Sequence, residues 1–239
     1  MIYPRIIAHR GGGALTPENT LAGLRLAARL GCHGVEFDAM LAADGVPVLI
    51  HDETLERTTS GRGRVADMNS THLVRLDAGG RHHPAFAAEP LPALDEALRL
   101  CATLGLWANV EIKPAAGQEV ETGRTVARHV AAAKGKLLLS SFSSAALCAA
   151  EDEAPQLPRA LLVQVIPPDW RERMAESGAL ALHSSARALT AETVAAVREA
   201  GLPLACYTVN NRDDAGRLFA MGVSAVFTDR PDLWLASEM

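Results

Sequence analysis

Aromatic side chains, positive charge and long apolar runs are all scarce in this 239-residue sequence. Aromatic residues make up only 4% of it although hydrophobic residues reach 49%, so its core must consist mainly of Ala, Leu and Val. The formal net charge is -5, which lacks the basic excess typical of nucleic-acid-binding proteins. We therefore expect no nucleic-acid partner. An anionic substrate would need local positive charge, from a metal ion or a few chosen side chains.

Membrane and disulfide signals are also missing. No run approaches the ~18 apolar residues of a membrane span, and residues 1–13 lack the apolar segment of a secretion signal. The four cysteines form no CxxC pair, so they are expected to be small buried hydrophobes rather than zinc ligands or a redox pair. A cytoplasmic protein without membrane insertion is the simplest interpretation. The sequence makes no prediction of oligomeric state.

Short apolar runs alternate with longer stretches of helical period, a pattern typical of β–α–β units. The expected strands are Arg5–Ala8, Gly34–Leu41, Leu106–Ile112, Lys136–Ser140, Ala160–Val163, Ala179–His183, Pro203–Thr208 and Ala225–Thr228. Helices are expected at Asn19–Leu30, Leu94–Thr103, Gly117–Ala133, Ser144–Glu151, Asp169–Glu176, Ala191–Ala200 and Arg212–Met221, with a short helical tail after Asp232. Eight such units favour an α/β fold of the (β/α)8 TIM-barrel type, with an open doubly wound sheet as the alternative.

One segment, residues 52–92, interrupts this alternation. It resembles a loop, with glycines at Gly61, Gly79 and Gly80, and only one helical turn is expected in it, near Asn69–Leu76. We interpret it as an insertion beside the second strand, within a single barrel domain spanning residues 1–239.

Polar residues recur at the ends of the expected strands. A TIM barrel carries its active site at the carboxyl ends of its strands, so these side chains should surround one mouth. They are His9, Arg10, Glu36, Asp38, His51, Glu111, Lys113, Ser140, Ser141, Gln164, His183, Asn210 and Asp229. Recurrence at strand after strand indicates a site more strongly than any single residue does.

Three of these residues are acids that should converge. Side chains two apart in a strand share a face, so Glu36 and Asp38 should point the same way, while Val35 and Phe37 point the other way. Together with Glu111 they would repel one another unless a cation lay between them. An all-oxygen ligand set favours Mg²⁺ or Ca²⁺ over zinc. For each acid alone, a salt bridge to Arg or Lys is the competing interpretation.

Two histidines suit proton transfer near neutral pH, because imidazole titrates in that range. His9 and His51 each close an apolar run and each precedes a charged residue. His183 is expected at the end of its strand, where it could contact substrate. The glycines at 11–13 could let a phosphate approach the backbone closely, or could simply form a tight turn.

In combination, these segments resemble the glycerophosphodiester phosphodiesterase family, most closely its cytosolic bacterial enzymes. The segments that carry the resemblance span nearly the whole chain. They are HRGGGALTPENT (9–20), VEFDAM (35–40), VPVLIHDETLERTTSGRGRV (46–65), LDAG (76–79), EPLP (89–92), NVEIKP (109–114), LSSF (139–142), YTVN (207–210) and TDRP (228–231).

The resemblance implies a TIM barrel with an insertion after the HD motif, and hydrolysis of a small-molecule glycerophosphodiester to sn-glycerol 3-phosphate and an alcohol. It implies that Glu36, Asp38 and Glu111 bind one divalent cation, Mg²⁺ or Ca²⁺. His9 and His51 would be the catalytic acid and base. Two cationic residues, Arg10 and Lys113, would bind the phosphate. None of these seven positions departs from the family pattern.

Three other functions remain to be weighed. A phospholipase C or D acting on membrane lipid would need a hydrophobic rim or a secretion route, and the sequence shows neither clearly. An amidohydrolase-type barrel would want an HxH pair on its first strand, which His9-Arg10-Gly11 does not supply. A non-catalytic phosphoester-binding protein on this fold would be expected to lose a histidine or a ligand acid, and none is missing.

Overall fold

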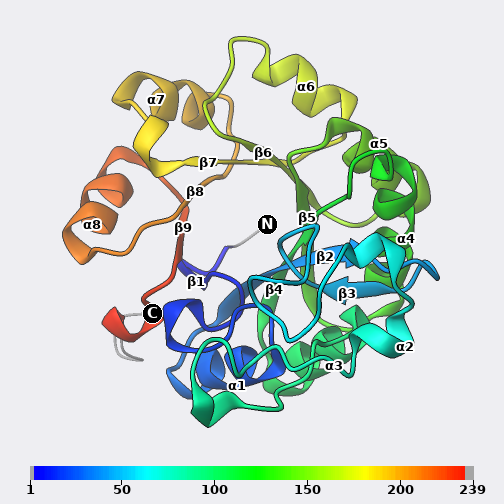
Figure 1. Cartoon of the computed structure of the whole chain (residues 1–239). Helices are drawn as coiled ribbons and strands as arrows, with labels where there is room; N and C mark the ends of the chain where they lie inside the picture. The colour runs from blue at the N-terminus through cyan, green and yellow to red at the C-terminus, as the bar shows by residue number, and fades with distance from the viewer. Residues whose placement is uncertain (1–2, 235–239) are drawn as a thin grey trace.

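The computed structural model describes residues 3–234, which form a closed barrel with helices outside it (Figure 1). Its parallel strands are β1 (Ile6–Ala8), β2 (Gly34–Leu41), β4 (Trp107–Ile112), β5 (Lys136–Ser141), β6 (Arg159–Val163), β7 (Ala181–Ser185), β8 (Leu204–Tyr207) and β9 (Ala225–Thr228). Strand β1 pairs with both β9 and β2, so the sheet closes on itself. This closure confirms the predicted (β/α)8 TIM barrel and excludes the open sheet.

The helices surround the barrel because each buries one apolar face against the strands. They are α1 (Leu21–Arg29), α3 (Leu94–Leu104), α4 (Glu119–Ala132), α5 (Ser144–Glu153), α6 (Trp170–Glu176), α7 (Ala191–Glu199) and α8 (Arg212–Met221), whereas the four-residue α2 (Ser70–Leu73) lies in the segment of residues 52–92. Local signals set their ends. The Thr20 hydroxyl accepts a hydrogen bond from the Gly23 N–H and so caps α1. Helix α8 ends at Gly222, whose φ of 110° suits glycine.

Two features of the strands differ from expectation. Strand β7 lies two residues later than predicted, so His183 sits in the middle of the strand rather than at its end. A further short strand, β3 (Pro47–Leu49), pairs antiparallel with β2 and forms a hairpin that brings the chain back toward the mouth. Its three residues are too few to show a clear period in the sequence.

The segment of residues 52–92 is irregular, as predicted. It contains α2 and two short 3-10 turns, Val65–Asp67 and Pro84–Phe86. Its apolar side chains, such as Leu55 and Leu73, pack with residues of the β2–β3 hairpin in a separate buried cluster. This packing holds the insertion against the β2–β3 side of the barrel mouth.

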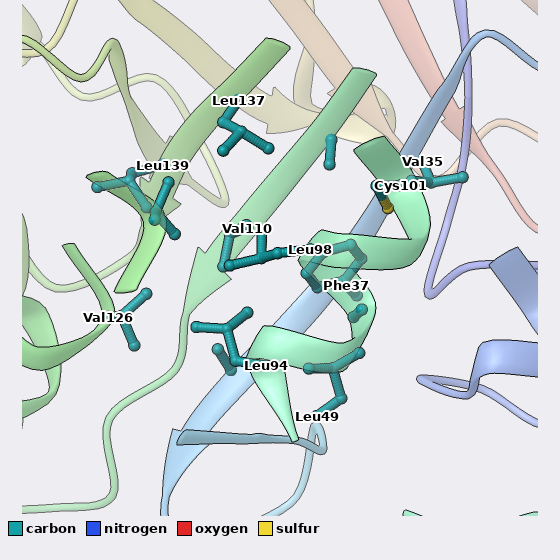
Figure 2. Close-up of a cluster of buried hydrophobic side chains, with 14 of the residues drawn as sticks. Val35, Phe37, Leu49, Leu94, Leu98, Cys101, Val110, Val126, Leu137 and Leu139 are labelled. Atoms are coloured by element: carbon teal, nitrogen blue, oxygen red, sulfur yellow. The ribbon is translucent and has the colours of Figure 1, made fainter. Parts of the chain in front are cut away.

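The main core lies between the outer face of the barrel and its helices (Figure 2). Val35 and Phe37 of β2 point outward into it and pack with Leu94 and Leu98 of α3 and with Val110 of β4. The alternation of side chains along β2 therefore turns Glu36 and Asp38 inward, as the sequence predicted. The hydrophobic core and the acidic cluster therefore lie on opposite faces of β2.

No helix between residues 3 and 234 is long and apolar enough to cross a bilayer. The four cysteines are free; Cys32, Cys101 and Cys206 are buried and Cys148 is half-buried. Cys32, Cys101 and Cys206 pack as small hydrophobic side chains, as expected, whereas Cys148 differs from the expectation because its Sγ donates to the Glu176 carbonyl at 3.3 Å.

Candidate active site

A cavity of about 360 Å³ opens at the carboxyl ends of the strands. All seven predicted site residues line it, and they come from β2, β4 and the segments that follow β1, β3 and β4. The complete lining consists of His9, Arg10, Glu36, Asp38, His51, Asn109, Glu111, Lys113, Phe142, Leu162, Gln164, His183, Tyr207, Thr208 and Phe227. The chain thus brings together residues separated by more than a hundred positions in the sequence.

Some residues expected near the mouth do not line this cavity. Ser140 accepts a hydrogen bond from Asn109, and Ser141 donates one to the Ile112 carbonyl, so both serines join neighbouring strands. Asn210 binds the Asp229 carboxylate and backbone. The two serines are therefore buried between strands, whereas Asn210 is exposed and holds Asp229.

The three acids form a compact cluster. One carboxylate oxygen from each of Glu36, Asp38 and Glu111 lies within 4.8 Å of the others. Their exposed fractions are only 3%, 1% and 9%, respectively. Burial, and then the neighbouring charge of Asp38, raises the pKa of both glutamates. Burying three carboxylates costs free energy unless positive charge lies beside them. The cluster is therefore a candidate cation site.

Asp38 has more hydrogen-bond and ion-pair partners than the other two carboxylates of the cluster. Asn19 donates to Asp38 Oδ2 at 2.9 Å and accepts from the Asp38 N–H at 3.0 Å. Lys113 Nζ lies 3.7 Å from the other oxygen, Oδ1, and Arg10 Nε lies 3.8 Å from Oδ2. Burial alone would raise the pKa of Asp38, but Lys113, His51 and Arg10 outweigh it and lower that pKa. Asp38 therefore stays ionised.

His9 is oriented by an acid from the far end of the chain. Its Nδ1 lies 2.7 Å from Asp229 Oδ1, and its Nε2 lies 3.9 Å from Glu36 Oε2. Burial disfavours the imidazolium, yet Asp229 and Glu36 outweigh burial and raise the pKa of His9. A carboxylate on Nδ1 fixes the tautomer and directs Nε2 toward the acidic cluster.

His51 has the same kind of support. Its Nδ1 lies 2.7 Å from Asp52 Oδ1, and its Nε2 lies 2.7 Å from Lys113 Nζ. With Nδ1–H donated to Asp52, the Nε2 lone pair accepts from the Lys113 ammonium. Burial and the nearby cations Arg10 and Lys113 lower the pKa of His51, although Asp38 and Asp52 oppose them.

Arg10 is fixed through both backbone and side chain. Its φ of 50° is unusual for a residue other than glycine, and it lets the Arg10 N–H donate to Glu36 Oε2 at 2.9 Å. The side chain donates through Nη1 to Glu18 Oε1 at 2.9 Å. The Arg10 guanidinium and the Lys113 ammonium thus lie on the same wall as the acidic cluster.

The glycine loop forms a tight turn. The Gly11 N–H donates to the Glu36 carbonyl, and the Gly13 N–H donates to the His9 carbonyl. A Cβ at Gly13 would lie within 2.6 Å of three backbone atoms of Asp229. Gly13 is therefore needed where the loop after β1 packs closely against Asp229, in the tight turn that was one of the two interpretations of this loop.

Sequence reasoning gave no role to four residues that hold the site together: Glu18, Asn19, Asp52 and Asp229. Each lies in a segment that carries the family resemblance, so a signal was present. Their partners, however, depend on the fold; Asp229 and His9 are 220 residues apart. His183 lines the cavity, but it is wholly buried and bonded to the Tyr3 hydroxyl, and burial lowers its pKa to about 3.

Fold and site together define a (β/α)8 barrel of the enzyme type, with an acidic cluster between two carboxylate-paired histidines at its mouth. The sequence profile of the glycerophosphoryl diester phosphodiesterase family matches residues 9–233. The chain belongs to this family, and it is an enzyme of the glycerophosphodiester phosphodiesterase class.

Named relatives are similar to this chain over nearly its whole length. A glycerophosphodiester phosphodiesterase of Caldanaerobacter subterraneus subsp. tengcongensis is 33% identical over 95% of this chain and 94% of its own length. An Oleispira antarctica phosphodiesterase, solved with its product sn-glycerol 3-phosphate, is 36% identical with a TM-score of 0.93, covering 96% of this chain and 94% of its own. The Agrobacterium tumefaciens glycerophosphodiester phosphodiesterase is 28% identical, with a TM-score of 0.79 and coverages of 97% and 98%.

Proposed function

We propose that this protein is a metal-dependent glycerophosphodiester phosphodiesterase of the cytoplasm, which releases sn-glycerol 3-phosphate and an alcohol during glycerophospholipid breakdown. The observation that carries the proposal is the clustering of Glu36, Asp38 and Glu111 in one cavity with His9 and His51. The product bound to the Oleispira antarctica relative supports the same substrate class.

The acidic cluster fits a divalent cation. Glu36 Oε1 is buried and has no hydrogen-bond partner, a state that a cation would relieve. The ligands would be Glu36, Asp38 and Glu111, and their oxygen atoms suit Mg²⁺ or Ca²⁺. A cation bound there would act as a Lewis acid toward the phosphate.

His9 and His51 would move the protons. One histidine takes a proton from the nucleophile, either the neighbouring glycerol hydroxyl or water, and the other gives a proton to the leaving alkoxide. Asp229 and Asp52 each hold an Nδ1 atom and so fix the two imidazoles relative to the cavity. This pairing supplies the orientation that proton transfer requires.

Arg10 and Lys113 would bind the phosphate. Both side chains lie on the wall that carries the acids, and both are held by hydrogen bonds to acidic residues or to His51. Fixed positive charge stabilises the negative charge that develops on the phosphoryl oxygens in the transition state.

The test is release of glycerol 3-phosphate from glycerophosphocholine by the purified protein, with and without EDTA. We expect turnover that EDTA abolishes and that added Mg²⁺ or Ca²⁺ restores. Parallel assays with phosphatidylinositol and sphingomyelin should give no product. Equal turnover in EDTA would disprove metal dependence, and no turnover with any metal would disprove hydrolysis of this substrate.

A further inference from the structure

Two side chains of the cavity, His51 and Arg10, are each held by a carboxylate at the protein surface. Asp52 holds His51, and Glu18 holds Arg10. Asp52 belongs to the segment after β3, whereas Glu18 belongs to the segment between β1 and α1. These two loops are far apart in the sequence, and neither of these hydrogen bonds joins them.

The Arg57 guanidinium joins the two carboxylates. Its Nη1 donates to Glu18 Oε2 at 2.7 Å, and its Nη2 donates to Glu18 Oε1 at 2.8 Å. Its Nε donates to Asp52 Oδ2, and Nη2 also donates to Asp52 Oδ1 at 3.0 Å. All three nitrogen atoms are therefore engaged, and each carboxylate receives two of the four hydrogen bonds.

Arg10, Glu18, Arg57 and Asp52 alternate in charge along this network. Glu18 Oε1 accepts from both Arg57 and Arg10, and Asp52 Oδ1 accepts from Arg57 while it pairs with His51. A network of Arg10, Glu18, Arg57, Asp52 and His51 thus runs around the mouth from one cavity wall to the insertion. Without Arg57, two carboxylates would face each other across the gap between the loops.

We propose that Arg57 is a positioning residue. Its planar guanidinium holds both Asp52 and Glu18, and through them it aligns His51 and Arg10. This role rests on the proposed function, because it assumes that His51 and Arg10 act on the substrate. The Arg57 side chain is 47% exposed, so solvent screens its ion pairs, and their contribution to the stability of the fold is small beside that of the buried core. Its loss should therefore change the kinetics far more than the melting temperature.

The main test compares Arg57→Gln with the wild type, using glycerophosphocholine and saturating metal. Removing a residue that orients functional groups typically costs about 10- to 100-fold, so we expect kcat/KM to fall by that amount. We expect kcat to fall through His51 and KM to rise through Arg10. Arg57→Lys keeps the charge without the planar fork and should recover only a minor part of the loss.

Arg64 provides a matched control. It belongs to the same insertion, is 50% exposed and pairs with Glu53 at 2.9 Å, and neither residue is among those that line the cavity. Arg64→Gln should keep wild-type kcat and KM. Equal kinetics for Arg57→Gln and Arg64→Gln, in an active and metal-dependent wild type, would overturn the positioning role while leaving the proposed function intact.

Double-mutant cycles test whether Arg57 acts through Asp52 and Glu18. In an Asp52→Asn background, adding Arg57→Gln should cause little further loss of kcat, and in a Glu18→Gln background it should cause little further rise in KM. Fully additive losses in both backgrounds would contradict the proposal. If the wild type shows no turnover, the proposed function is wrong, and the proposed role of Arg57 is wrong with it.

Discussion

The two halves of the barrel mouth differ in chemistry. The half built by β1, β2, β3 and β4 supplies all seven of the predicted catalytic, phosphate-binding and metal-binding residues. The half built by β5 to β9 lines the same cavity with uncharged side chains, including Phe142, Leu162, Tyr207 and Phe227. The rings of Phe142 and Tyr207 contact each other edge to face, with 6.0 Å between their centroids.

This division indicates how one cavity can handle both parts of a phosphodiester. In the proposed function the charged side chains would bind the phosphoryl group, and the opposite wall would offer apolar surface to the alcohol attached to the phosphate. Changes on the charged half should therefore affect the reaction with every substrate. Changes on the uncharged half should affect it in proportion to the size and polarity of the alcohol.

Metal removal should give the largest effect. Lewis-acid stabilisation is worth several kcal/mol, so EDTA should lower turnover by roughly 10³-fold or more. Glu111→Gln removes one ligand charge from the cluster, and it should raise the metal concentration needed for half-maximal activity by at least about tenfold. Metal titrations of the initial rate measure both effects. An unchanged titration curve for Glu111→Gln would argue against Glu111 as a ligand.

Loss of either histidine comes next. His9→Ala and His51→Ala should each lower kcat by about 10²-fold or more, the size expected for a general acid or base. The metal titration should stay close to that of the wild type. His33→Ala is the control, because His33 is an exposed histidine at the start of β2, the opposite end of the barrel. Near-wild-type turnover in both variants would exclude the acid–base assignment.

The charged half was largely predictable from the sequence, and the reason is physical. Strands of a parallel barrel are buried on both faces and appear as short apolar runs, so acids inside such a run, such as Glu36 and Asp38, are conspicuous. Their spacing of two residues then places them on one face. The same logic located Glu111 and Lys113.

The supporting contacts could not be predicted in this way. Whether Asp229 meets His9, or Arg57 meets Glu18, depends on barrel closure and on how the insertion packs, and neither leaves a period in the sequence. His183 shows the same limit on a smaller scale. A shift of two residues in β7 moved it from the expected strand end to the buried interior of the barrel.

Phe142→Ala tests the uncharged half. Phe142 is 39% exposed, and burial of roughly 40 Å² of its surface by a substrate would be worth about 1 kcal/mol, or ~5-fold in kcat/KM. This loss is expected for a glycerophosphodiester with an aromatic alcohol, and not for glycerophosphoglycerol. Leu180→Ala, at an exposed leucine before β7, is the control. Equal losses with both substrates would show that Phe142 does not distinguish between alcohols.

Leu94→Ala should have the smallest effect on catalysis, although it lies directly behind the charged half. Leu94 is fully buried between α3 and the outer face of β2 and β4, on the side of β2 opposite Glu36 and Asp38 (Figure 2). Its truncation leaves a cavity and should lower the free energy of unfolding by about 2–5 kcal/mol, measured by urea denaturation.

The folded fraction of Leu94→Ala should keep wild-type kcat, because the two faces of β2 serve separate purposes. Leu104→Ala on the same helix is the matched control; Leu104 is 37% exposed, so its truncation should change stability by no more than about 0.5 kcal/mol. A large fall in kcat for Leu94→Ala at full folding would mean that the outer core sets the geometry of the acids, and that the two faces of the strand are mechanically coupled.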